Sequence, residues 1–380
     1  MDKSTFSVSQ VTPSSASVKN LSLSFSNLEI NYGAPNTNES TIASLMSLNK
    51  HEILFLITEE IGSQYLQQFM SLMDSTIVDR IFYALFIRVF EVMSDQFGRH
   101  VFAKLIKSCS HDQLQLITLK ITSRDDLLFK ASLNKHGSSS IKQLIRVISK
   151  SPPPQLIDLI TSALKRLFKH MMITKSGLSI LLHCLETLTN HQNDNIYLAA
   201  LEDFDRVSCR EQGCISMNNF IDEMSGTRRK QLLYLISINS ASLSNDPYGN
   251  FVVQHVIELE NPEFIELICF ALKGQLVDLS MLKEGSHVVE KILKFENFIG
   301  HVVFDFLNSD RILQVANDRY GNYVIQKALK ESLRVDRYLF QSLVMKLKQE
   351  DFDSLRFGYG KNVFKFITGC GVPIPQPGFF

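Results

Sequence analysis

The sequence predicts an all-α solenoid, a stack of helical repeats, and three observations point to this fold class. Glycine recurs at a near-constant spacing, with four successive intervals of 36 residues between Gly177 and Gly321. Motifs around these glycines are near copies, as in NDPYGNFVVQHVI (245–257) and NDRYGNYVIQKAL (317–329). Apolar residues follow each glycine with the 3.6-residue period of an α-helix. Because a unit this short cannot bury its apolar face alone, the copies must stack on one another.

Composition is consistent with this class. The chain has 380 residues, of which 45% are hydrophobic, so disorder over the full length is excluded. A single compact core stops growing well below this length, whereas a solenoid does not. The 39 Lys and Arg residues balance the 39 Asp and Glu residues. This balance argues against binding of nucleic acid or membrane by bulk charge attraction, although it leaves a local site open.

The chain also gives no signal for a membrane, a secretory pathway or a metal. The most hydrophobic run, from Ile81 to Ile87, is too short to span a bilayer, and arginines flank it. The N-terminus lacks the apolar block of a secretory signal. The cysteines form no C-x-x-C pair, so we expect reduced, buried thiols and no metal or other cofactor.

Along the chain, residues 1–45 are rich in Ser, Thr and Asn and are expected to be a disordered leader. Residues 46–371 form the repeat domain, within which the prolines of 151–154 must interrupt any helix. Residues 372–380 form a Pro-rich tail. The repeat glycines are Gly62, Gly98, Gly137, Gly177, Gly213, Gly249, Gly285, Gly321 and Gly360.

Each repeat is predicted to contain two helices. One follows the glycine, and its expected core residues are Val252, Val253, Val256 and Ile257 in one copy and Val324, Ile325, Ala328 and Leu329 in another. The other is an apolar segment upstream, such as Arg337–Leu347. The D-x-x-G motif before the glycine is typical of a capping turn, because an Asp or Asn side chain accepts hydrogen bonds from free backbone amides.

Three positions on the helix after the glycine are candidates for binding. The two residues after the glycine are called here the first and second positions, and the residue four after the first is the third position. The first and third lie on one face, one turn apart. In three consecutive repeats the positions hold Asn250, Phe251 and Gln254, then Ser286, His287 and Glu290, then Asn322, Tyr323 and Gln326.

The chemistry of these triplets suits unpaired bases. A ring at the second position offers a surface for stacking, worth about 1–3 kcal/mol per base. The amides of Asn and Gln carry donor and acceptor atoms, which match the pairing edge of uracil. An ionised Glu290 is an acceptor only, which matches the two adjacent N–H donors of guanine. The three repeats therefore predict uracil, guanine and uracil.

A simpler interpretation is that the polar residues are only solvated and that each ring packs on a neighbour. For a single repeat this interpretation is preferable. Three consecutive repeats that carry the same polar, ring, polar order favour the binding hypothesis.

The glycine-centred motifs at 36-residue spacing resemble the Pumilio (PUF) family of RNA-binding repeat proteins over about residues 46–370. The resemblance implies a right-handed α-solenoid crescent of about eight repeats with flanking half-repeats. It also implies binding of single-stranded RNA on the concave face, one base per repeat. Family members bind the RNA antiparallel to the chain, so Gly321, Gly285 and Gly249 mark repeats eight, seven and six, and the 5′ end of the target is UGU.

The remaining repeats depart from this pattern to different degrees. Repeat one carries Ser63 and Gln67, which the resemblance assigns to adenine, and His100 of repeat two is a candidate for stacking. Repeats three to five lack a matched pair, with Leu178 and Leu182 in repeat four. Basic residues that could contact phosphates are Lys104, Lys142, Lys291 and Lys327.

No catalytic motif is present, so we expect a binding protein and no enzyme. The first hypothesis is a monomeric cytoplasmic regulator that binds UGU elements in mRNA 3′ untranslated regions. It would repress translation or promote decay through recruited repression or deadenylation machinery. A second hypothesis is a degenerate family member in ribosomal RNA processing, in the nucleus or nucleolus. A third is a protein-binding scaffold, since many helical solenoids bind proteins.

Overall fold

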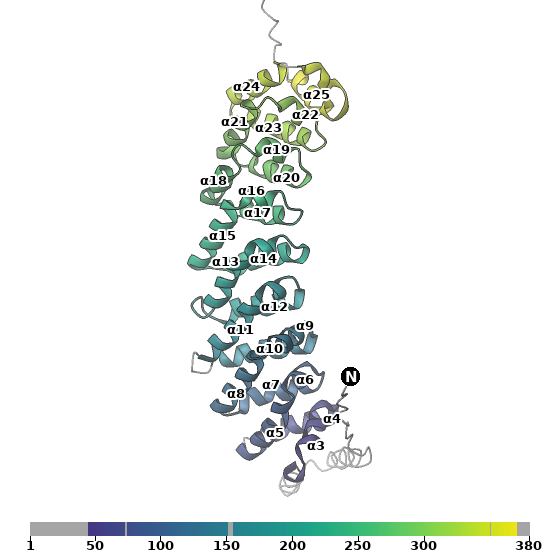
Figure 1. Ribbon diagram of the computed structural model, residues 1–380, viewed down its shortest axis with the longest axis vertical. Coiled ribbons are helices and arrows are strands. Elements are labelled where there is room, and N and C mark those ends of the chain that lie inside the picture. The colour runs from purple at the N-terminus through teal and green to yellow at the C-terminus, as the bar shows by residue number, and fades with distance from the viewer. Residues whose placement is uncertain (1–44, 73, 151–154, 350, 371–380) are drawn as a thin grey trace, which may run out of the picture. The chain divides into compact units, whose positions relative to one another are not determined.

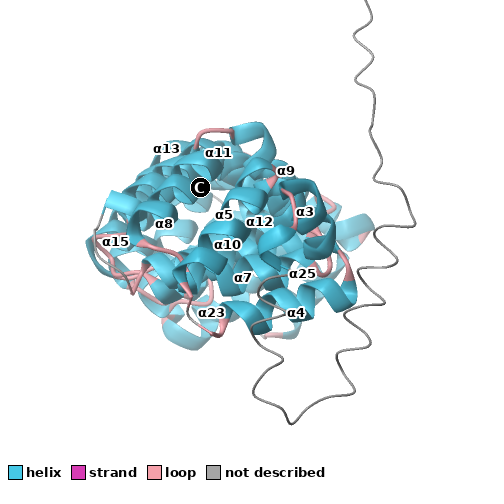
Figure 2. Ribbon diagram, turned by 90° about the horizontal axis from the view of Figure 1, so that it is seen from below, coloured by secondary structure: helices cyan, strands magenta, loops and turns pink. Residues whose placement is uncertain are grey.

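The computed structural model describes residues 45–72, 74–150, 155–349 and 351–370. Apart from Leu45, the predicted leader lies outside the described residues, as do the proline-rich segment 151–154 and the C-terminal tail. The described residues form helices and loops without a strand, which confirms the all-α class (Figure 2). They divide into two compact units.

The first unit holds the described residues up to Leu167 together with Ser176–Ile196. Two long helices, α11 (Gln155–Met172) and α13 (Asp194–Ser208), contribute residues to both units. The other helices of this unit, in chain order, are α3 (Lys50–Thr58), α4 (Glu60–Met70), α5 (Ser75–Ile87), α6 (Val89–Ser94), α7 (Gly98–Ser108), α8 (His111–Thr122), α9 (Asp125–Leu133), α10 (Lys135–Ile148) and α12 (Lys175–Thr187).

The second unit holds Phe168–Lys175 and the described residues from Tyr197 onward. Its helices are α14 (Glu211–Glu223), α15 (Gly226–Ile238), α16 (Ser240–Ser244), α17 (Gly249–Glu258), α18 (Pro262–Ala271), α19 (Leu276–Ser280), α20 (Lys283–Ile292), α21 (Ile299–Leu307), α22 (Ile312–Asn317), α23 (Gly321–Val335), α24 (Arg337–Lys348) and α25 (Lys361–Gly369). Three 3₁₀ turns lie between them, η2 (Glu296–Phe298), η3 (Phe352–Arg356) and η4 (Gly358–Gly360).

In repeats six to eight the structure adds a third, short helix to the two that were predicted. It lies between the upstream helix and the glycine helix, as α16, α19 and α22 do. Such a helix has five or six residues and spans less than two turns. It is therefore too short to show a hydrophobic period in the sequence, which explains why only two helices were expected.

Within the second unit the helices form two layers (Figure 1). The upstream helices α15 and α18 contact each other, as do α21 and α24, while the glycine helices α14, α17, α20 and α23 stack in succession. The predicted core residues of α17 and α23 are buried between these layers without solvent exposure. They are Val252, Val253, Val256 and Ile257, then Val324, Ile325, Ala328 and Leu329.

The repeated glycine is required by close packing. At Gly321 an added Cβ would lie 2.5 Å from the backbone oxygen of Val315 on the preceding short helix and 2.8 Å from its Cγ1. At Gly285 the corresponding distance to the Leu279 oxygen is 2.7 Å. Real Cβ atoms do not approach a carbonyl oxygen so closely, so glycine allows the short helix and the glycine helix to touch.

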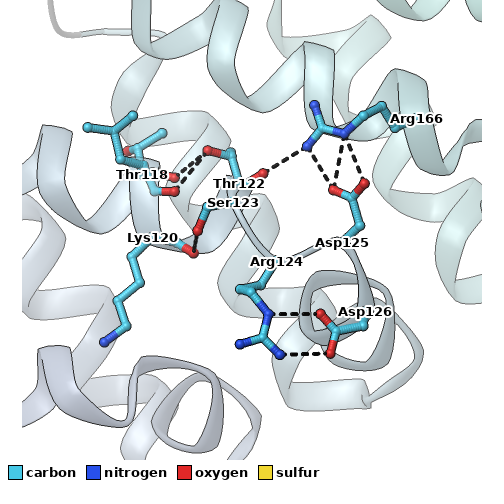
Figure 3. Close-up of polar contacts among 9 residues, drawn as sticks. Thr118, Lys120, Thr122, Ser123, Arg124, Asp125, Asp126 and Arg166 are labelled. Atoms are coloured by element: carbon cyan, nitrogen blue, oxygen red, sulfur yellow. Dashed lines mark hydrogen bonds and ion pairs between the residues drawn. The ribbon is translucent and has the colours of Figure 1, made fainter.

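In the first unit, an arginine links the upstream helices of adjacent repeats (Figure 3). Arg166 of α11 donates to both carboxylate oxygens of Asp125 and, at 2.8 Å, to the backbone oxygen of Thr122 at the end of α8. These hydrogen bonds hold the pKa of the Asp125 carboxyl below its usual value. The contact fixes the turn between α8 and α9 against the next repeat.

The cysteines agree only in part with the expectation of buried thiols. All six are free. Cys184, Cys214 and Cys269 are buried, and burial raises the pKa of Cys184 to about 12, so this thiol stays protonated at neutral pH. Cys370 is exposed at the C-terminal end of α25, so the expectation was wrong at this position.

Candidate nucleic-acid interface

In repeats two, three, six and eight the glycine helix begins at a side-chain cap, as the capping motif predicted. In repeat eight Asp318 Oδ1 accepts hydrogen bonds from the amides of Tyr320 and Gly321 at 2.8 and 2.9 Å. Asp246 caps repeat six in the same way. Asp95 and Asn134 do so in repeats two and three of the first unit. The cap fixes where the helix starts and therefore the direction of the three candidate positions.

The three positions of repeats six to eight have distinct environments. The first is buried and the third is half-buried, while the second is exposed. This order places the polar pair beside an exposed ring in each repeat. The sets are those predicted, Asn250, Phe251 and Gln254, then Ser286, His287 and Glu290, then Asn322, Tyr323 and Gln326.

In repeats six and eight the two amide side chains are hydrogen-bonded to each other. Gln254 Nε2 donates to Asn250 Oδ1 at 2.9 Å, and Gln326 Nε2 donates to Asn322 Oδ1 at the same distance. Asn250 Nδ2 donates to the backbone oxygens of Asp246 and Pro247, so both of its N–H groups are engaged. The pair therefore offers a ligand the Gln Oε1 and the remaining lone pair of the Asn oxygen. These acceptors suit uracil N3–H.

Repeat seven presents a different pair. Ser286 Oγ donates to the backbone oxygen of Lys283 at 3.1 Å, so the hydroxyl oxygen is left as an acceptor. Among the described residues, Glu290 forms no ion pair or hydrogen bond, although the charge of Lys327 acts on it. A carboxylate that is half-buried and free to accept two hydrogen bonds suits the two N–H donors of guanine.

The rings at the second position are exposed in repeats six to eight. Phe251 is 52% exposed and Tyr323 is 59% exposed, and His287 is exposed as well. Within the part of the chain that the structure describes, Phe251 and Tyr323 pair with no other ring or cation. Both rings therefore have exposed surface on which a base could stack.

Among the described residues of the first unit, repeat one has a comparable arrangement. Ser63 is buried and donates to the backbone oxygen of Glu60 at 2.9 Å, while Gln67 is half-buried one turn later. His100 of repeat two is exposed at the second position. Partial burial, and then the charges of Arg99 and His136, lower the pKa of His100, so its ring is neutral at pH 7.

Repeats three to five do not present a base-reading pair. Leu178 of repeat four is buried at the first position, and Cys214 of repeat five donates to the backbone oxygen of Glu211. Lys142 Nζ donates to Ser179 Oγ, which stands at the second position of the next repeat. The sequence did not indicate this contact, because the two residues are remote along the chain.

The other lysines differ in their partners. Lys291 forms an ion pair with Glu258 of the preceding repeat. Lys104 and Lys327 are half-buried and form no ion pair with any described residue. The described residues contain no cluster of three or more His, Cys, Asp or Glu side chains that could hold a metal ion. None of the described helices has the length and apolar character needed to cross a membrane.

The sequence was compared with protein families and with curated relatives. The model of a NOP9-like PUF repeat domain matches residues 47–304, and a Pumilio-family RNA binding repeat matches residues 311–340. Pumilio homologs 12 and 11 of Arabidopsis thaliana are each 30% identical, over 83% and 82% of this chain. The chain spans about half the length of these two relatives, 52% and 55%.

Solved structures show the same fold. The RNA-binding domain of yeast Puf5p bound to MFA2 RNA superposes with a TM-score of 0.64 at 18% identity, over 86% of this chain and 97% of that one. The Puf4 RNA-binding domain bound to a 3′ UTR recognition sequence of HO endonuclease RNA gives a TM-score of 0.61 at 24% identity, over 82% and 97%. Together with the family model, which covers more than half of the sequence, these findings show that the chain belongs to the Pumilio (PUF) family of RNA-binding repeat proteins.

Proposed function

We propose that this protein binds single-stranded RNA in a sequence-specific manner and that repeats eight, seven and six bind a 5′-UGU element. One observation carries the proposal: three consecutive glycine helices hold a buried polar residue, an exposed second residue and a half-buried polar residue in the same geometry. Family membership and the RNA-bound structural relatives support it. The antiparallel direction follows from the resemblance to the family.

The proposed role is control of mRNA through elements in 3′ untranslated regions, by repression of translation or by decay. The protein itself would supply recognition, and recruited machinery would act on the message in the cytoplasm. Repeats three to five lack a base-reading pair, which is consistent with an RNA target that has a short fixed element followed by positions where any base is accepted. Selection of a message would then depend mainly on the UGU element bound by repeats six to eight.

A second candidate role is ribosomal RNA processing. The match to a NOP9-like repeat domain over residues 47–304 favours it, as does the absence of base-reading pairs in the described part of repeats three to five. RNA recovered from cells after crosslinking distinguishes the two roles. Precursors of ribosomal RNA would support this candidate, whereas 3′ untranslated regions would support the first.

Selection from a pool of randomised short RNAs at fixed salt is expected to enrich UGU. The readout is sequencing of the bound fraction. Gln254→Ala provides an internal control, because it removes one acceptor from repeat six and leaves repeats seven and eight intact. The third base should then become degenerate while the first two remain UG. Enrichment of sequences without UGU, or a variant that still requires the third uracil, would contradict the assignment.

Tyr323→Ala is expected to weaken RNA binding by about 1–3 kcal/mol, because an exposed ring in repeat eight can stack on a base. Fluorescence anisotropy with a UGU-containing RNA measures the loss. Phe304→Ala is the matched control, since Phe304 is 57% exposed but lies on α21 in the layer of upstream helices. Equal losses in both variants, or no loss in Tyr323→Ala, would show that this ring does not bind a base.

A further inference from the structure

In the second unit, polar contacts link consecutive glycine helices just beyond the third position. His255 of α17 follows Gln254, and its Nε2 lies 2.8 Å from Asp222 Oδ1 on α14. Lys291 of α20 follows Glu290 and forms an ion pair with Glu258 on α17. In both cases the basic residue comes directly after the third position, and the acid stands four residues after the third position of the preceding repeat. These pairs join repeats five, six and seven.

The corresponding pair between repeats seven and eight does not form. The basic position of repeat eight holds Lys327 on α23, but the acid position of repeat seven holds Lys294 on α20. Neither lysine forms an ion pair with any residue that the structure describes. Two lysines therefore occupy a place where each of the two preceding pairs joins a basic residue to a carboxylate. Two positive charges within electrostatic range repel each other, and an anion bound near both would relieve that repulsion.

Four charged residues lie close enough to Lys327 to act on its ammonium group. Lys327 is half-buried, and burial is the main cause that lowers its pKa. Glu290 and Glu331 oppose this shift, while Lys294 and Lys291 add to it, so all four lie within electrostatic range. Glu331 is engaged by Arg334 at 3.0 Å, and Lys291 is engaged by Glu258. Glu290 is therefore the one nearby carboxylate without an ion-pair partner among the described residues, and the proposed function assigns it to guanine.

We propose that Lys294 and Lys327 form a binding site for one backbone phosphate of the RNA, the phosphodiester between the bases held by repeats seven and eight. This inference rests on the proposed function. Helices α20 and α23 contact each other, and each lysine lies within one turn of a third-position residue, Glu290 or Gln326. A phosphate beside two adjacent bases is within reach of long lysine side chains at these places. It would supply the negative charge that the series of pairs lacks here.

The double variant Lys294→Gln and Lys327→Gln is expected to lower the salt dependence of RNA binding. For single strands, the slope of log K against log salt falls by about 0.7 for each phosphate contact that is lost. Affinity should fall by the same factor for UGU and for mismatched RNAs, because a phosphate carries no base identity. The charge-conserving variant Lys327→Arg should keep the slope of the unmodified protein. Lys273→Gln, which replaces an exposed lysine that follows α18, controls for the loss of one positive charge elsewhere on the unit and should also leave the slope unchanged.

A second measurement locates the phosphate. UGU-containing oligonucleotides that carry one uncharged methylphosphonate linkage, placed at successive positions, are titrated against the protein and the double variant. The unmodified protein should lose affinity most when the linkage between U and G is neutral, and the double variant should be insensitive to that change. This double-mutant cycle removes the same contact once by changing the lysines of the protein and once by neutralising the phosphate of the RNA.

Three results would overturn the inference. The first is an unchanged slope in the double variant with intact UGU binding. The second is a loss confined to the preference for guanine, which would show that Lys327 acts through Glu290. The third is equal sensitivity of both proteins to the neutral linkage. If the unmodified protein binds no RNA at all, the proposed function itself fails, and this outcome is distinct from the other three.

Discussion

Replacing Ser286 with Asn and Glu290 with Gln is expected to change the preferred second base from guanine to uracil. The structure gives the reason, because Asn and Gln at these positions in repeats six and eight form an internally hydrogen-bonded pair without a charge. The variant loses the carboxylate that matches the two N–H donors of guanine and gains the amide acceptors that match uracil N3–H. Matched pairs of this kind discriminate between bases by about 1–3 kcal/mol. Dissociation constants for UGU and UUU RNAs at one salt concentration measure the change.

The reciprocal variant is the control for this exchange. Asn322→Ser with Gln326→Glu should move the first base from uracil to guanine and leave the second unchanged. If the first variant still prefers guanine at the second base, repeat seven does not contact that base. Thermal unfolding of each variant checks that the fold is intact, which matters because Asn322 Nδ2 donates to the backbone oxygens of Asp318 and Arg319.

The fold and the candidate positions were predictable because they depend on short-range patterns. Gly249 and Gly321 recur with their capping residues Asp246 and Asp318, and the caps form as predicted. The apolar period placed Val252 and Val324 in the core, where they are fully buried. The same period placed the second position on an exposed face. These features are set by residues within a few positions of one another, so the sequence contains the information directly.

Contacts between repeats could not be predicted in the same way. The ion pair of Lys291 with Glu258 and the hydrogen bond of Lys142 with Ser179 depend on how far one helix is shifted along the next. Within repeat six, the hydrogen bond between the Asn250 and Gln254 side chains was not predicted either, because it depends on how the two amides are oriented. Lys291 and Lys327 look equivalent in the sequence, yet the structure gives only Lys291 an acidic partner. Their difference comes from Glu258 and Lys294, which belong to neighbouring repeats.

This dependence on neighbours has a consequence for stability. In a solenoid each repeat contacts only the adjacent ones, so the interfaces between helices supply much of the stability. In repeats six to eight the repeated glycine lies at such an interface, where the short helix touches the glycine helix. A change there should act on the fold and on the binding face together, because the first position follows the glycine directly.

Gly321→Ala is expected to lower the free energy of unfolding by about 1–3 kcal/mol, the usual cost of overpacking a close contact. The added Cβ would lie 2.5 Å from the Val315 oxygen, so α22 and α23 must move apart. The movement would shift Asn322 and Tyr323, so binding to UGU RNA should weaken as well. Urea unfolding followed by circular dichroism measures the first effect, and anisotropy titration measures the second.

Gly300→Ala is the matched control, and its expected effect has the opposite sign. Gly300 also lies in a helix of the second unit, α21, but a Cβ there would meet no atom within 4 Å. Alanine should therefore stabilise the helix by up to about 1 kcal/mol through its higher helix propensity. If both variants lower stability equally, the effect of Gly321→Ala does not come from the contact with Val315. If Gly321→Ala is neutral, the two helices can separate without cost, and close approach is not the reason that glycine stands at this place.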